Sequence, residues 1–339
     1  MKIQTTKIPN CFIDLHLHLD GAITPAIAKR LARLQNQILP AETDEKLAQL
    51  LSIPRQCEDL NEYLKRFDLP ISLLQTKESI CEAVFLVCEQ LRRENVLYAE
   101  LRFAPQSFTE RGLSQRDVIE AALKGLERTS FCGNLILCCM RGSGREKANE
   151  ETVQLAKEYL VEHGGVVALD LAGAEGVFPT SDYKRLFAVA SQLNVPFTLH
   201  AGEADGAESV RCAIEMGASR IGHGVRSFED KALIDLLRYK KIPLELCPTS
   251  NRQTHAVSDM KKYPLADFIR ENLCITINTD NPAISNTTIA EEFNYARKLG
   301  VSLEQEILML FNAVDAAFTD EKTKQQLKSN LQKKLTALG

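Results

Sequence analysis

Short apolar runs alternate with longer amphipathic stretches along this chain, and the alternation is regular from residue 97 onward. A short apolar run bounded by turn residues is typical of a buried strand, and apolar residues at spacings of three and four are typical of a helix. On this basis we expect strands over residues 11–19, 97–104, 134–141, 166–172, 196–200, 220–225, 243–247 and 274–279. We expect helices over residues 115–129, 147–163, 181–193, 208–216, 229–240 and about 264–272, with further helices up to the C-terminus.

Three of these helices carry end signals. Ser114 with Asp117, and Ser227 with Asp230, have the spacing of a capping box at a helix start. Gly217 directly follows Met216 and predicts a helix end there.

Eight strands that each lead into a helix predict parallel strands with right-handed crossovers, and eight such units close into a (β/α)8 barrel. The alternative is an open doubly wound sheet, which would lead us to expect a glycine-rich phosphate-binding turn after an early strand. The sequence contains no Gly-x-Gly-x-x-Gly and no Gly-Lys-Ser/Thr. We therefore predict one TIM-barrel domain over residues 1–339, with extra C-terminal helices.

The segment from about residue 22 to 96 is too long for a simple crossover between two barrel strands, and we predict a helical insertion after the first strand. We expect helices over residues 25–34, 58–64 and 77–94. An insertion at this point would lie over the barrel mouth. Leu60, Tyr63 and Leu64 could then form an apolar wall for a ligand, although packing on the barrel would explain them equally well.

Composition narrows the class of protein. The net charge of −4 gives no reason to expect a nucleic-acid partner, and no apolar run is long enough to span a bilayer. The N-terminus lacks the apolar core of a signal peptide, so we expect a cytoplasmic protein. Ten scattered cysteines without any Cys-x-x-Cys pair predict buried reduced thiols rather than a cysteine zinc site. The sequence leaves the oligomeric state open.

The placement of the six histidines is informative. Four of them, His16, His18, His200 and His223, fall at predicted strand ends, where the active sites of TIM barrels form. His163 at a helix end and His255 in a polar loop are interpreted as surface residues.

Acidic residues accompany these histidines. Asp280 follows the last predicted strand, and Glu203 stands three residues after His200. Two histidines from one strand, one from another and an aspartate suit Zn²⁺ or another first-row metal with a position left for water, whose pKa would fall towards ~7. Glu203 would then be free to move protons, and His223 to orient or deprotonate the water.

Each of these residues also has a simpler interpretation. His16 and His18 could be solvated on a half-exposed strand, and His223 could be a buried hydrogen-bonded core residue. Glu203 could balance a helix dipole, and Asp20 could cap the next helix.

Four segments together resemble the motifs of the adenosine deaminase family in the amidohydrolase superfamily, in order and over nearly the whole chain. They are residues 16–22 (His-Leu-His-Leu-Asp-Gly-Ala), 200–203 (His-Ala-Gly-Glu), 222–224 (Gly-His-Gly) and 279–280 (Thr-Asp). The resemblance implies one catalytic zinc per chain, with the ligands His16, His18, His200 and Asp280. It also implies that Glu203 protonates N1 of the purine and that His223 activates and orients the attacking water.

The resemblance further implies zinc-dependent hydrolytic deamination of adenosine or 2′-deoxyadenosine, which gives inosine or 2′-deoxyinosine together with ammonia. Deamination of another 6-aminopurine, adenine or a 5′-substituted adenosine, is the alternative, and a non-catalytic binding protein on the same barrel is a third. The implied substrate contacts come from His18, from Asp20 to the ribose 5′-hydroxyl and from the Gly173 amide to N3. Asp20 favours a nucleoside. Ala104 offers the substrate no side-chain hydrogen bond.

Asn281 departs from the family pattern, which has a second Asp that hydrogen-bonds N7 of the base. N7 is an acceptor, so a carboxylate there must be protonated to donate, whereas an amide NH₂ donates at any pH. We expect Asn281 to contact N7. We also expect the exchange of a carboxyl for an amide to change how tightly and how strictly adenine is bound.

Overall fold

The computed structural model describes residues 8–53, 63–257 and 259–336. It contains two four-stranded parallel sheets, with strand orders β1-β2-β3-β4 and β5-β6-β7-β8. The strands are β1 (Phe12–His18), β2 (Val96–Phe103), β3 (Gly133–Met140), β4 (Val166–Ala172), β5 (Thr198–Ala201), β6 (Arg220–His223), β7 (Leu244–Leu246) and β8 (Ile275–Ile277).

Two further parallel pairings join these sheets into one closed barrel. Leu169 of β4 pairs with Phe197 just before β5, and Leu17 of β1 pairs with Asp280 just after β8. The second junction is held by backbone hydrogen bonds, in which the His18 amide donates to the Asp280 carbonyl at 2.7 Å and the Asp280 amide to the His16 carbonyl at 2.8 Å. The predicted (β/α)8 barrel is confirmed, and the open sheet was the wrong alternative.

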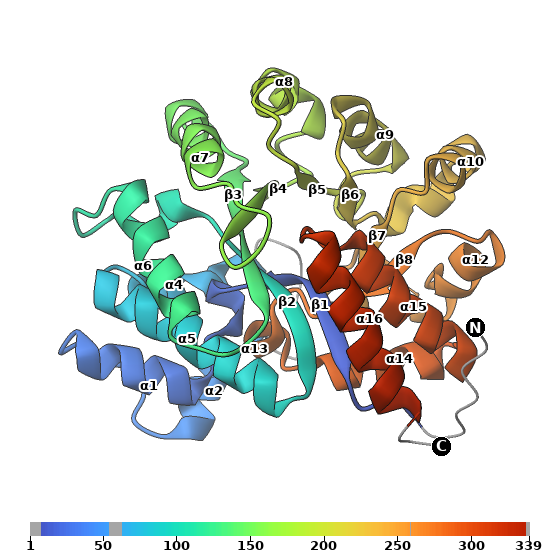
Figure 1. Ribbon diagram of the computed structural model, residues 1–339. Helices are drawn as coiled ribbons and strands as arrows, with labels where there is room; N and C mark the ends of the chain where they lie inside the picture. The colour runs from blue at the N-terminus through green and yellow to red at the C-terminus, as the bar shows by residue number, and fades with distance from the viewer. Residues whose placement is uncertain (1–7, 54–62, 258, 337–339) are drawn as a thin grey trace.

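Helices surround the strands on the outside (Figure 1). Those that follow strands β2 to β7 are α6 (Gln115–Glu127), α7 (Glu146–Glu158), α8 (Lys184–Gln192), α9 (Ala207–Met216), α10 (Lys231–Lys240), α11 (Pro248–Gln253) and α12 (Leu265–Arg270). After β8 come α13 (Pro282–Ser285), α14 (Ile289–Lys298), α15 (Leu303–Ala316) and α16 (Glu321–Thr336). Both α14 and α15 pack against β1 and β8, so the C-terminal helices cover the junction that closes the barrel.

The segment between β1 and β2 is helical, as expected. Its elements are η1 (Asp20–Ala22), α1 (Pro25–Leu34), α2 (Asp44–Leu51), η2 (Lys65–Phe67), α4 (Asp68–Ser72) and α5 (Lys77–Arg93). Most of the helix expected over residues 58–64, including Leu60, lies outside the described residues. Tyr63 and Leu64 are described and are helical.

Some predicted helix ends are correct and others are wrong. Ser114 and Asp117 form the expected capping box of α6, and Gly217 ends α9 with a φ of +97°. The capping box with Ser227 is wrong, because Asp230 is itself the N-cap and its side chain accepts hydrogen bonds from the amides of Ala232 and Leu233. The helix expected to reach residue 163 ends at Glu158, because the chain then turns and Leu160 pairs with Val166.

The barrel interior is unusually charged. The fully buried Arg102 of β2 donates to Asp170 at 3.0 Å and to Glu245 at 2.9 Å. Arg220 of β6, also buried, donates to Glu245 at 2.6 Å and to Glu100 at 2.5 Å. Charges removed from water are tolerated when they are paired and hydrogen-bonded in this way.

The nine cysteines of the described residues are all free, in agreement with the expected reduced thiols. Within the same residues, every helix is too short or too polar to cross a membrane.

Candidate active site

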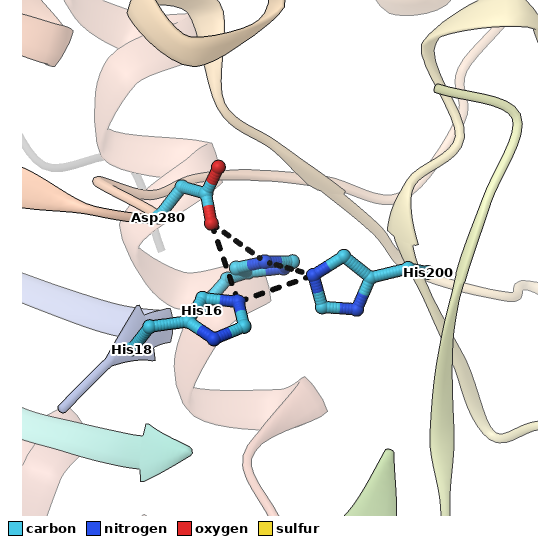
Figure 2. Close-up of side chains that lie close together, drawn as sticks. All are labelled: His16, His18, His200 and Asp280. Carbon is cyan, nitrogen blue, oxygen red and sulfur yellow. Dashed lines mark hydrogen bonds and ion pairs between the residues drawn. The ribbon is translucent and has the colours of Figure 1, made fainter. Parts of the chain in front are cut away.

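Four predicted residues converge at the carboxyl ends of the strands, where His16, His18, His200 and Asp280 point toward one another (Figure 2). One ligand atom from each lies within 4.8 Å of all the others. Nε2 of His200 lies 3.1 Å from Nε2 of His16 and 3.2 Å from Nε2 of His18. Oδ1 of Asp280 lies 3.3 Å from Nε2 of both His16 and His18.

Local backbone geometry produces this convergence. Residues two apart on a strand share a face, so the β1 alternation directs His16 and His18 the same way. His200 comes from β5, and Asp280 follows β8 with a φ of +62°. A positive φ is rare for a residue with a Cβ and costs free energy that surrounding contacts must supply. Here the barrel-closing hydrogen bonds hold the Asp280 backbone in place.

Two buried carboxylates set the tautomers of the histidines. Nδ1 of His16 donates to Glu245 at 2.8 Å, and Nδ1 of His200 donates to Asp170 at 2.9 Å. These bonds leave each Nε2 with its lone pair directed into the cluster. Sequence reasoning assigned no role to Asp170 or Glu245, although a charged residue inside a short apolar strand was an available signal.

The cluster fits a first-row metal ion. Donor atoms about 2.0–2.1 Å from a tetrahedral zinc would lie about 3.3 Å from one another. Four of the six spacings between donor atoms of these residues, those of His200 to His16 and His18 and those of Asp280 to the same two histidines, are 3.1 to 3.3 Å and close to that value. All four donor atoms lie within 4.8 Å of one another. Three imidazole nitrogens and a carboxylate oxygen are also a donor set that zinc accepts.

Burial and neighbouring charges shift the pKa values of the residues in this cluster. Burial opposes ionisation of Asp280, but the hydrogen bond and charge of His16 hold the pKa of Asp280 below its ordinary value. Burial lowers the pKa of His18 well below its ordinary value, so this imidazole is neutral at pH 7. Burial and the charge of Arg102 oppose protonation of His16, yet hydrogen bonds to Asp280 and Glu245 outweigh them and raise its pKa.

Glu203 lies beside the cluster and does not belong to it. Its Oε1 accepts a hydrogen bond from Thr254 at 3.0 Å, and its Oε2 lies 3.5 Å from Nε2 of His223. Burial, followed by the charges of Asp280 and Glu175, raises its pKa to about 8. The side chain therefore holds a proton at neutral pH. Glu203 precedes Gly206, the N-cap of α9, and the acidic residue in the first turn of that helix is Glu208, so the helix-dipole interpretation does not account for the position of Glu203.

His223 stands at the end of β6 with a φ of +60°. Nδ2 of Asn251 donates to its Nδ1 at 3.0 Å, and Oδ1 of Asn251 accepts from the Tyr263 hydroxyl at 2.9 Å. Burial and the charge of His16 lower the pKa of His223 well below its ordinary value. The neutral ring thus carries its proton on Nε2, which faces Glu203.

A cavity of about 320 Å³ opens over these groups. Its lining includes predicted residues from both ends of the chain, namely His18, Asp20, Tyr63, Leu64, Ala104, Gly173, His200, Glu203, His223, Asp280 and Asn281. The two remaining histidines are exposed and absent from this lining, and His163 interacts with the Thr319 hydroxyl at 3.1 Å. Leu60 lies outside the described residues, so the expected apolar wall is represented by Tyr63 and Leu64.

Asp20 is buried in η1, and burial raises its pKa to about 7. Thr24, and not Asp20, caps α1, so the capping interpretation was wrong. Gly173 has a φ of +105°, a conformation that favours glycine.

Asn281 is packed tightly at the cavity wall. A Cβ on Gly21 would stand 2.0 Å from Oδ1 of Asn281, so the glycine makes room for this side chain. That Oδ1 is buried and has no hydrogen-bond partner among the described residues. A buried acceptor without a hydrogen-bond partner costs free energy.

Comparisons with known proteins agree with this arrangement. A family model described as adenosine deaminase matches residues 11–334. An adenosine deaminase of Haemophilus ducreyi is 46% identical, over 96% of this chain and 97% of the relative. The structure of an adenine deaminase from Arthrobacter aurescens has a TM-score of 0.86 at 25% identity, covering 96% of this chain and 99% of that chain.

A second solved structure, of the N6-methyl-AMP deaminase of Arabidopsis thaliana, has a TM-score of 0.80 at 27% identity and covers 95% of this chain and 96% of that chain. The fold, the convergent histidine and aspartate cluster and the match over nearly the full length agree on one conclusion: this chain belongs to the adenosine deaminase family.

Proposed function

We propose that this protein hydrolyses the 6-amino group of adenosine and 2′-deoxyadenosine, giving inosine or 2′-deoxyinosine and ammonia. One observation carries the proposal: the buried carboxyl group of Glu203, whose pKa burial raises to about 8, shares a cavity with a four-residue cluster that could hold a metal ion. A protein that only bound a purine would need no proton donor at this place.

His16, His18, His200 and Asp280 would hold one zinc ion per chain. When bound, the ion supplies the positive charge that makes a water molecule acidic enough to attack at neutral pH. Asp170 and Glu245 keep the Nδ1 protons of His200 and His16 in place, so that both Nε2 atoms remain available as ligands.

Glu203 acts as the acid. Water adds to C6 of the purine, and the addition is easier when N1 is protonated as C6 becomes tetrahedral. The Glu203 proton moves to N1, and the hydrogen bond from Thr254 steadies the carboxylate that forms. This interaction is stronger in the transition state than in the ground state, so it accelerates the chemical step.

His223 and Asp280 would both form hydrogen bonds with the attacking water. With its proton on Nε2, His223 donates to the water oxygen and directs it toward C6, while Asp280 accepts a water proton. That proton goes to the amino group, which leaves as ammonia. The new C6 hydroxyl returns a proton to Glu203 as it becomes the carbonyl of inosine, so both carboxyl groups end as they began.

Asn281 and the Gly173 amide would recognise the purine base through hydrogen bonds. The Gly173 amide would donate to N3. The Asn281 amide would donate through Nδ2 to N7, which is an acceptor.

Asp20 would hold the ribose 5′-hydroxyl. A carboxyl at this position accepts a hydrogen bond from a hydroxyl and repels a 5′-phosphate when ionised, so we expect a nucleoside to be preferred to a nucleotide. The structural similarity to an adenine deaminase makes the free base the second candidate substrate.

The test is product identification by mass after incubation of zinc-loaded protein with adenosine, 2′-deoxyadenosine, adenine or AMP. We expect a gain of one mass unit with the two nucleosides, loss of turnover after chelation of the metal and recovery when zinc is restored. Glu203→Gln should retain metal and ligand binding while kcat collapses. Deamination of adenine alone would favour the second candidate, and no deamination of any of them would refute the proposal.

A further inference from the structure

Glu175, in the loop between β4 and η4 (Thr180–Tyr183), has an unusual set of partners. Its Oε2 accepts hydrogen bonds from the amides of Glu203, Ala204 and Asp205 at 2.9, 2.7 and 3.1 Å. Its Oε1 accepts from the Gly202 amide at 2.7 Å and from the Ser209 hydroxyl at 2.5 Å. The Glu175 carboxylate thus accepts hydrogen bonds from four consecutive backbone amides and from one hydroxyl.

These amides belong to the loop that carries Glu203 from β5 to α9. A concave run of N–H groups is an anion-binding arrangement, and here the anion comes from the protein itself. Glu175 is only 2% exposed, so water cannot easily replace its five bonds. Gly202 has a φ of +70°, and the bond from its amide helps to keep this conformation.

We infer that Glu175 is a positioning residue for deamination: it holds the 202–205 backbone so that the Glu203 carboxyl faces N1 of the substrate. This inference rests on the proposed role of Glu203. Glu175 does not line the cavity, so it acts through the loop and without touching substrate. Thr254 positions the carboxyl end of the same side chain, while Glu175 positions its backbone end.

Glu175→Gln tests the inference with little change in size. An amide has one acceptor oxygen, so its NH₂ group must face at least one backbone N–H, and the loop loses part of its support. Because a misplacement of about 1 Å at a reacting group costs about 100-fold, we expect kcat per zinc-loaded site to fall 10- to 100-fold. KM for adenosine and bound zinc should change less than threefold.

The matched control is Glu306→Gln in α15. Glu306 is also a buried glutamate, but it pairs with Arg297 among the C-terminal helices and has no contact with the Glu203 loop. We expect unchanged kcat in this variant. Hydrogen exchange at residues 202–205 should accelerate in Glu175→Gln and stay slow in Glu306→Gln. Unchanged kcat per loaded site in Glu175→Gln would overturn the inference.

A double-mutant cycle separates positioning from a general effect on folding. If Glu175 acts through Glu203, then Glu175→Gln should alter the residual kcat of Glu203→Gln less than twofold, because the group being positioned is already gone. A further loss as large as that in the single variant would overturn the inference.

A second variant serves if Glu175→Gln fails to fold. Ser209→Ala removes one hydrogen bond to Oε1 of Glu175, and kcat should fall at least threefold with KM unchanged. An unchanged kcat counts against the inference.

Failure of the proposed function gives a different result. If the wild-type protein deaminates no 6-aminopurine, the function is wrong. If the wild type is active while Glu175→Gln has wild-type kcat, the function stands and only the role of Glu175 is refuted.

Discussion

Asp170 accepts a hydrogen bond from Nδ1 of His200 at 2.9 Å, and this contact decides which nitrogen of His200 faces the cluster. Burial opposes ionisation of Asp170, but the charges of His200 and Arg102 hold its pKa well below the ordinary value. The carboxylate is therefore present at any pH at which the protein would work. A ligand histidine held this way is both oriented and made a better donor.

Asp170→Asn should weaken metal binding by about 10- to 100-fold, because the Nδ1 proton of His200 loses a charged acceptor. Arg102 keeps its second partner, Glu245, so the variant should fold. Zinc affinity is measured by competition with a chromophoric chelator, with Glu306→Gln as the control. An unchanged affinity would show that Asp170 does not support the ligand.

Glu203 should make the metal-free protein less stable as pH rises. Its pKa is about 8 in the folded state and near 4.5 when the chain unfolds. Below pH 4.5 the group is protonated in both states and its stabilising contribution is complete. Between pH 4.5 and 8 the unfolded chain releases this proton while the folded protein retains it, so the contribution is progressively lost.

Glu203→Gln removes this dependence. In the presence of a chelator, the Tm of Glu203→Gln minus that of the wild type should be larger at pH 8 than at pH 5. The exposed Glu304→Gln in α15 serves as the control and should show no such change. A Tm difference that is equal at both pH values would contradict the raised pKa.

Asp20→Ala should lower kcat/KM for adenosine by about 10- to 100-fold, which is the effect expected from loss of a hydrogen bond to a charged group. The same change should have little effect on 5′-deoxyadenosine, which has no hydroxyl for Asp20 to hold. The measurement is initial rates for both substrates with both proteins. Equal losses for the two substrates would place the effect of Asp20 elsewhere than at the 5′ position.

Asn281→Ala should lower kcat/KM for adenosine by at least about 10-fold, because N7 loses its hydrogen-bond donor in a buried site. For 7-deazaadenosine, which has no N7 acceptor, wild-type activity should already be low and the variant should lose much less. Asn281→Asp separates an amide from a carboxyl, and it should donate to N7 only while protonated. Identical losses for both substrates would argue against contact with N7.

The periodicity of the chain determined much of the architecture by itself. Eight strands were predicted within a few residues of their observed ends, because buried strands need apolar runs and because the crossover helices need an amphipathic face. The cluster of His16, His18, His200 and Asp280 was predictable for a related reason. Parallel strands in a barrel all bring their carboxyl ends to one rim, so polar residues at those ends must be neighbours.

Only the tertiary structure decided which groups support that cluster. Asp170, Glu245, Asn251 and Glu175 reach their partners across strands and loops that are distant in sequence, and no local pattern encodes those contacts. The Asp230 cap likewise depended on how the chain leaves β6. Sequence periodicity specifies the face on which a side chain lies, whereas a hydrogen bond requires two atoms within about 3 Å, and that distance is set by the closure and packing of the whole barrel.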